Sequence, residues 1–115
     1  MTRHSDLLQG TLDLLVLQVL TQGPLHGWAI SKEIYLLSNE ALNVTQGSMY
    51  PALHRLEDGG DVTAEWRTSE QGRRAKYYAL TTQGRKRLRD EMAGWRRFTE
   101  AVEGVLVRCH PKPAP

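Results

Sequence analysis

The sequence predicts a mainly α-helical fold with a small β-hairpin, extended by one long C-terminal helix through which two copies of the chain pair. Apolar residues recur at helical spacing over most of the 115 residues. Between residues 62 and 80 the spacing changes to the alternation of strands. The last helical stretch carries more apolar surface than so short a chain can bury alone. We therefore expect one domain over residues 5–80, the long helix over 81–108 and a disordered tail over 109–115.

The composition is that of an ordinary globular protein. The chain is 40% apolar and 24% charged, and its length allows one domain with a modest core. No apolar run approaches the roughly 20 residues that span a membrane, so no membrane association is expected. Residues 1–6 lack the pattern of a signal peptide. Cys109 is the only cysteine, which excludes an intrachain disulfide and favours a cytoplasmic location.

The net charge of +2 hides a strong asymmetry along the chain. Residues 67–97 hold ten basic and three acidic side chains, a local charge of +7. The other residues hold five basic and ten acidic side chains, a charge of −5. A basic segment in a mildly basic protein indicates a polyanionic partner. The alternative, that the charges only solvate a helix face, remains open for residues 85–97.

The first two predicted helices cover residues 7–21 and 26–38. Residues 7–21 are almost all apolar, so this helix needs covering on nearly every side and a second copy of the chain is expected to help. Gly23 and Pro24 then break the chain. In the second helix, apolar residues recur at i, i+4 and i+7 from Ile30. His26, at its start, is expected to form a structural hydrogen bond rather than to bind a ligand.

Residues 45–60 predict a third helix with a polar free face. Thr45 is suited to cap its N-terminus, and Met49, Leu53 and Leu56 form one apolar stripe. Two helices joined by a short link, the second with a polar free face, form a helix-turn-helix pattern. Such a face suits a DNA major groove, although an ordinary amphipathic surface helix fits the same residues. The candidate DNA-binding residues of this helix are Thr45, Gln46, Ser48, Tyr50, Pro51, His54 and Arg55.

A β-hairpin is predicted after Gly60. Residues 62–67 alternate in strand fashion, residues 69–73 form a glycine-containing turn, and residues 76–80 form a second short strand. Its tip carries Arg73, Arg74 and Lys76, which are placed to meet phosphates or to enter a minor groove. A merely solubilising loop is the alternative.

The last helix begins at Thr81 or Thr82 and runs to about Val107. Its apolar stripe steps by threes and fours, and a single small domain cannot cover it. Pairing with a second copy about a two-fold axis resolves this, so the dimer is expected to be obligate. The candidate dimer-interface residues are Leu8, Leu12, Leu15, Leu88, Met92, Trp95, Phe98 and Val102. Trp95 either anchors the dimer or lines a gap that admits a flat aromatic effector, with Arg96 and Arg97 at its rim.

The sequence offers little for catalysis. No pair of carboxylates lies in an apolar setting, and no Ser-His-Asp arrangement or phosphate-binding glycine loop is present. The four histidines, among them His54, lack the spacing of metal ligands, and Cys109 next to His110 lies in the tail. We expect no enzyme, no metal and no cofactor.

Three segments resemble one family. They are Leu25–Ile30 (LHGWAI), Gly47–Glu57 (GSMYPALHRLE) and Gly72–Thr81 (GRRAKYYALT), the last followed by Gly84. Together with the order of helices and hairpin, they resemble the PadR-like transcriptional regulators, in the branch with a short C-terminal part. The resemblance extends from about residue 8 to residue 106. Ala75 departs from it, because it stands between basic residues of the hairpin.

The resemblance implies a winged helix-turn-helix domain over residues 5–80 and a dimerisation helix over 81–108. It implies a cytoplasmic, homodimeric, sequence-specific repressor of operator DNA that a small, often aromatic, effector releases. Two alternatives remain: a winged helix that binds proteins without DNA, and a small-molecule-binding regulator that has lost its DNA role. The basic hairpin argues against both.

Overall fold

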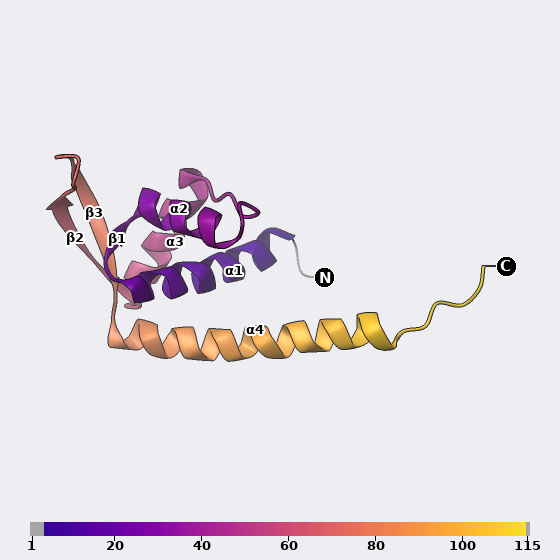
Figure 1. Ribbon diagram of the computed structural model, residues 1–115. Helices are drawn as coiled ribbons and strands as arrows, with labels where there is room; N and C mark the ends of the chain where they lie inside the picture. Colours follow the sequence, from indigo (N-terminus) through magenta and orange to yellow (C-terminus); the bar gives the residue numbers. More distant parts are fainter. Residues whose placement is uncertain (1–3, 115) are drawn as a thin grey trace.

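The computed structural model of the chain describes residues 4–114, with side chains described from residue 10 onwards. Four α-helices and three strands follow one another in the order α1, β1, α2, α3, β2, β3, α4, with a short 3₁₀ segment η1 after α1 (Figure 1). The helices α1 to α3 form a cluster, the hairpin of β2 and β3 flanks it, and α4 runs beneath it. Mainly helical structure with one small sheet, as predicted from the spacing of apolar residues, is thereby confirmed.

The first helix begins three residues earlier than the predicted residue 7, and its α-helical part ends at Val19 instead of residue 21. α1 spans His4–Val19, and η1 continues it over Leu20–Gln22. Gly23 then takes a φ of +127°, a conformation that residues with a side chain rarely adopt, and so turns the chain. The predicted helix over residues 7–21 is therefore helical throughout, but its last turn is a 3₁₀-helix and not an α-helix.

His26 has two structural roles, one of which the sequence did not reveal. As expected, its side chain forms a local hydrogen bond: Nδ1 accepts from the Ala29 amide at 3.2 Å and caps α2 (Gly27–Leu37). Its backbone, with that of Leu25, forms the strand β1. Leu25 pairs with Tyr78 and His26 with Tyr77, so the hairpin is part of a three-stranded antiparallel sheet in the order β1-β3-β2. The expectation that the helix begins at His26 was wrong by one residue.

The predicted third helix forms as α3 (Gln46–Asp58). Thr45 Oγ1 accepts from the Ser48 amide at 3.2 Å, which confirms the predicted cap. Pro51 lies inside the helix. Of the two glycines at the end, Gly60 has a φ of +83°, whereas Gly59 keeps a helical φ of −79°.

The two strands of the hairpin are β2 (Val62–Thr68) and β3 (Arg74–Leu80), in a register that pairs Val62 with Leu80 and Thr68 with Arg74. Both strands extend further towards the tip than the sequence predicted. Because side chains alternate between faces, alternate residues of β2 from Val62 lie on the face turned towards α3. The base of this face is buried and its outer part is exposed.

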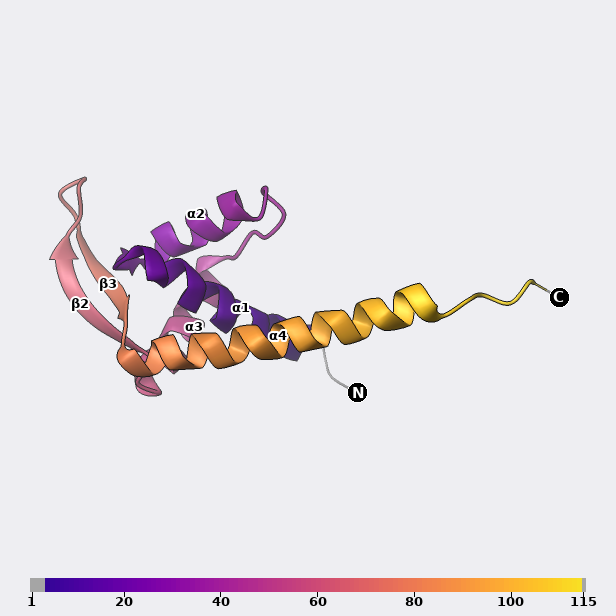
Figure 2. The same ribbon diagram turned by 60° about the horizontal axis from the view of Figure 1, so that its bottom comes forward.

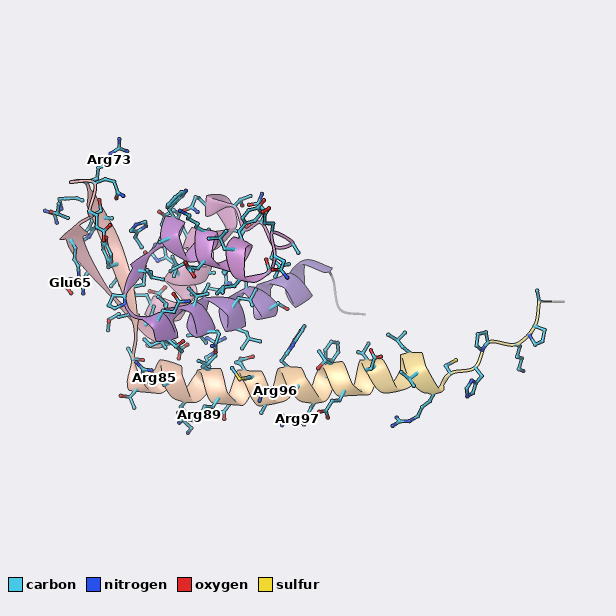
Figure 3. All side chains as sticks on the ribbon, in the orientation of Figure 1. Glu65, Arg73, Arg85, Arg89, Arg96 and Arg97 are labelled. Carbon is cyan, nitrogen blue, oxygen red and sulfur yellow. The ribbon has the colours of Figure 1, made fainter. Side chains whose placement is uncertain are left out.

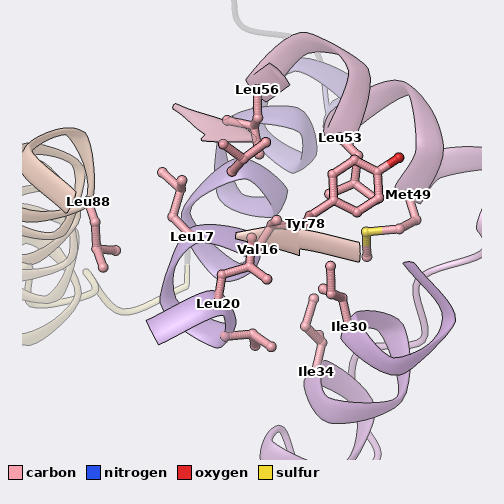
Figure 4. Packing of buried hydrophobic residues seen from close by; sticks show 12 residues of the cluster. Val16, Leu17, Leu20, Ile30, Ile34, Met49, Leu53, Leu56, Tyr78 and Leu88 are labelled. Atoms are coloured by element: carbon pink, nitrogen blue, oxygen red, sulfur yellow. The ribbon is translucent and has the colours of Figure 1, made fainter. Parts of the chain in front are cut away.

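One apolar core joins all the elements (Figure 4). The predicted stripe of α3 is fully buried in it, against side chains of α1, α2 and β3. Leu88 of α4 belongs to this core with only 7% of its surface exposed. Leu88 was expected at a dimer interface, but its own chain already covers it.

The helix α4 spans Thr82–Arg108 and starts at a tight joint with the end of α3. Thr81 caps it by accepting from the Gly84 amide at 3.0 Å, and Thr81 Oγ1 donates to the Gly60 carbonyl at 2.7 Å. Gln83 Nε2 donates to the Gly59 carbonyl at 2.6 Å. Gly84 lies so close to the Asp61 carbonyl that a Cβ there would overlap it.

From this joint α4 passes along α1 and extends well beyond the helical cluster (Figure 2), so the molecule measures 66 × 27 × 24 Å. Residues 109–114 have no regular secondary structure. Among the helices of residues 4–114, none combines the length and apolarity that crossing a bilayer requires.

Candidate nucleic-acid interface

A groove of about 1110 Å³ separates the inner face of the hairpin from α3 and the start of α2. One wall is formed by Tyr50 and His54 of α3, the other by Trp66 and Arg74 of the hairpin. The groove is lined by both aromatic and cationic side chains. These are the two kinds of group that contact the sugars and phosphates of nucleic acid.

The residues predicted on α3 fall into two groups. Ser48, Tyr50, Pro51 and His54 are exposed. Thr45 and Arg55 are exposed as well, but these two residues and the half-buried Gln46 bond other parts of the chain: Thr45 caps the helix, Gln46 Nε2 donates to Ser31 Oγ at 3.0 Å, and Arg55 Nη2 pairs with Asp13 Oδ1 at 3.0 Å.

Tyr50 is placed by a close approach between α2 and α3. A Cβ at Gly27 would come within 3.0 Å of the Tyr50 ring, so the ring packs directly over the backbone at the start of α2. The absence of a side chain at residue 27 therefore lets the ring lie at the mouth of the groove while 47% of Tyr50 stays exposed.

The three cations predicted at the hairpin tip have different environments. Arg73 lies at the tip itself and points away from the domain (Figure 3). Arg74 lies over the Trp66 ring, 5.8 Å from its centroid. Lys76 lies further down β3 and its Nζ bonds Glu57 Oε1 of α3 at 3.2 Å. That hydrogen bond raises the pKa of Lys76 above its usual value, so the lysine stays charged and joins the hairpin to α3.

Trp66 and Trp28 were not among the predicted site residues. Each is 58% exposed and lines the groove. Trp66 continues the alternation of Val62 and Ala64 beyond the point where the domain can cover it. The sequence feature that could have revealed Trp66 as a site residue is an aromatic side chain in the outer half of a hairpin, where the domain cannot bury it.

The basic segment of the sequence divides into two separate surfaces. Arg73 and Arg74 border the groove, whereas Arg85, Arg89, Arg96 and Arg97 belong to α4, where Arg89 and Arg97 lie on the side that faces away from the helical cluster (Figure 3). The second group is therefore remote from the groove. The solvated-face alternative that the sequence left open describes its position well.

The residues predicted at the dimer interface lie on α1 and α4. Leu12, Leu15 and Met92 are partly buried against the core, and the side chain of Leu8 lies outside the described residues. The apolar residues further along α4 are open: Trp95 is 43%, Phe98 52% and Val102 42% exposed. Trp95 and Phe98 line a shallow groove of about 410 Å³ against the middle of α1.

A metal centre is not apparent in the described part of the chain. Nowhere between residues 4 and 114 do three histidine, cysteine or acidic side chains gather in a way that holds an ion.

Three helices, a hairpin wing and a long final helix define a winged helix-turn-helix protein. A family model described as the transcriptional regulator PadR-like family matches residues 16–90. A transcriptional regulator of Mycobacterium tuberculosis is 31% identical over 91 residues, which cover 79% of this chain and 81% of that protein.

Solved structures of transcriptional regulators have the same fold as this chain. A transcriptional regulator from Clostridium thermocellum superimposes with a TM-score of 0.77 at 26% identity, covering 89% of this chain and 96% of that one. A PadR-like transcription factor from Bacteroides fragilis has a TM-score of 0.71 at 31% identity, covering 88% and 95%. The chain belongs to the PadR-like family of transcriptional regulators.

Proposed function

We propose that the protein is a homodimeric repressor that binds double-stranded operator DNA, with α3 in the major groove and the hairpin at the adjacent minor groove. The observation that carries this proposal is the groove between α3 and the hairpin, because one DNA strand passes between two elements that occupy neighbouring grooves. The exposed residues of α3 face the bases, and the hairpin faces the phosphates.

The charges of the hairpin support this assignment. Neither Arg73 nor Arg74 has a carboxylate partner among the described side chains. Their charge is therefore available to an external anion. Trp66 adds an exposed ring beside Arg74, and such a ring packs against deoxyribose.

The homodimer is supported by the open stripe of α4. Trp95, Phe98 and Val102 lie on a helix that extends past the domain, and apolar residues in such a row favour burial against a second copy. A two-fold axis presents each stripe to its counterpart and brings two α3 helices onto one duplex.

Release by a small molecule is the last part of the proposal. The shallow groove at Trp95 and Phe98 supplies two aromatic rings whose centroids lie 6.2 Å apart. A second copy over this groove would enclose it and leave a slot for a flat aromatic effector. Trp95 as a plain anchor of the dimer is the competing role.

The test begins with genomic fragments that the purified protein retains, which are sequenced to obtain an operator. Fluorescence anisotropy then measures affinity for this operator and for a scrambled duplex over a range of salt concentrations. His54→Ala is expected to weaken operator binding by about 1–3 kcal/mol, as for loss of a base contact, and to leave the scrambled duplex unaffected.

Arg73→Ala is expected to weaken binding to both duplexes alike. It should also reduce the slope of log affinity against log salt concentration by about 0.9, the value for one lost phosphate contact. Trp66→Ala is expected to weaken binding without changing the slope, because a ring carries no charge. A wild-type protein that retains no DNA at low salt would favour the alternative of a protein-interaction module.

A further inference from the structure

One carboxylate connects the proposed DNA-reading helix to α4. Asp13 of α1 is only 8% exposed, and a charge so nearly buried requires a cationic partner. It has two. Asp13 Oδ1 accepts from Arg55 of α3 at 3.0 Å, and Asp13 Oδ2 accepts from Arg87 of α4 at 3.2 Å.

Arg87 is itself firmly held. Its Nη1 donates to Asp61 Oδ2 at 2.7 Å, and its Nε donates to Glu91 Oε1 at 3.5 Å. Burial lowers the pKa of Arg87, but the hydrogen bond to Asp61 and the nearby carboxylates raise it further, so the net shift is upward. Arg87 thus remains a fixed positive charge beside Asp13.

Arg55 is held more loosely. Among the described residues its guanidinium bonds one side chain, that of Asp13, and 40% of the Arg55 side chain is exposed. A guanidinium has five donors, so the others can reach an external phosphate. Since one carboxylate serves two guanidinium groups, the two compete for its charge. Withdrawing Arg87 would let Asp13 bind Arg55 more tightly.

We propose that Asp13 is a positioning residue that sets how available Arg55 is to a DNA phosphate, and that Arg87 of α4 controls this hold. The inference rests on the proposed DNA-binding function. Because Arg87 and Arg55 share the Asp13 carboxylate, any loss of the Arg87 contact increases the share of its charge left for Arg55. Arg87 thereby links α4 to the surface of α3.

The experiment compares two substitutions of opposite predicted sign. Asp13→Asn keeps the shape of the side chain but removes its charge, and so weakens its hold on Arg55. The affinity for a scrambled duplex should rise, and its salt dependence should steepen by about 0.9 for one added phosphate contact. Arg87→Gln should have the reverse effect, with a weaker affinity and a flatter slope, because Asp13 is left to Arg55 alone.

Controls separate this coupling from a general change of charge or stability. Glu103→Gln changes the net charge as Asp13→Asn does, and Arg89→Gln changes it as Arg87→Gln does. Both lie at exposed sites of α4 and should leave the slope unchanged. In an Arg55→Gln background neither Asp13→Asn nor Arg87→Gln should retain its effect. General damage to the fold would shift both variants in the same direction, and that result would overturn the proposal.

A second readout does not need DNA. The Arg55 side-chain N–H signal in NMR, assigned by its loss in Arg55→Gln, should report a more mobile guanidinium in Asp13→Asn and a less mobile one in Arg87→Gln. Unchanged Arg55 mobility in both variants would reject the coupling, and the proposed DNA-binding function would not be affected by that result. If the wild type binds no duplex, the proposed function falls, and this signal alone decides whether Arg87 controls Arg55.

Discussion

At the scale of single residues, the position of α4 depends on the missing side chain of Gly84. The backbone of α4 meets the Asp61 carbonyl there with no space for a Cβ, and neither partner is a flexible side-chain end. The contact fixes where the long helix leaves the domain. Other substitutions at this residue would have to move one backbone away from the other.

Gly84→Ala is therefore expected to lower the free energy of unfolding by about 1–3 kcal/mol, as overpacking of a close contact does. Gly47→Ala is the matched control. Its Cβ would meet only Thr45 Oγ1 at 3.8 Å, so a change within about 1 kcal/mol is expected, in the stabilising direction. Thermal or urea unfolding at one fixed protein concentration measures both. Equal stability of the Gly84→Ala variant and the wild type would contradict the close contact.

At the scale of elements, the hairpin and α3 are connected by the ion pair of Lys76 and Glu57. This pair places one cation of the hairpin between two elements rather than at the tip. The three basic residues that the sequence grouped together should consequently differ in their effect on DNA binding.

Lys76→Ala should flatten the salt dependence of duplex binding less than Arg73→Ala, because Glu57 already neutralises the lysine. Glu57→Gln should steepen the dependence by releasing Lys76 to a phosphate, by at most about 0.9. Anisotropy titrations at four or more salt concentrations give these slopes. Equal slopes for Lys76→Ala and Arg73→Ala would show that the ion pair opens when DNA binds.

The elements that the sequence predicted best are those specified by neighbouring residues. Thr45 and Thr81 each cap a helix through an amide three residues away, so both helix starts could be recognised locally. The strand β1 could not, since Leu25 and His26 are strand-like only because they pair with Tyr78 and Tyr77 of a distant hairpin.

The same distinction applies to the candidate site. Exposure of Arg73 follows from its place in a turn. The partner of Arg55 lies 42 residues away and that of Lys76 lies 19 residues away. Which cations remain free is decided by packing between elements, and hydrophobic periodicity carries no information about it.

At the scale of the whole molecule, the open stripe of α4 predicts a dimer in solution. Sedimentation at low micromolar concentration should show two chains per particle. Trp95→Ala should weaken the association, because it removes a large apolar side chain from the proposed interface. Trp28→Ala is the control: it removes a similarly exposed tryptophan remote from α4 and should leave the dimer intact. A folded monomer of the wild type under these conditions would reject the arrangement.

The joint at Thr81, Gln83 and Gly84 also constrains how α4 can vary in length. Each residue inserted after it advances the helix by about 1.5 Å and rotates everything beyond by about 100°. One insertion before Trp95 would turn the apolar stripe towards the sides of α4 that now carry arginines. Seven insertions would restore its direction to within about 20° while carrying it about 10 Å further from the joint. Eleven insertions would restore it equally well, so relatives that keep both the joint and the stripe should differ there by about seven or eleven residues, or not at all.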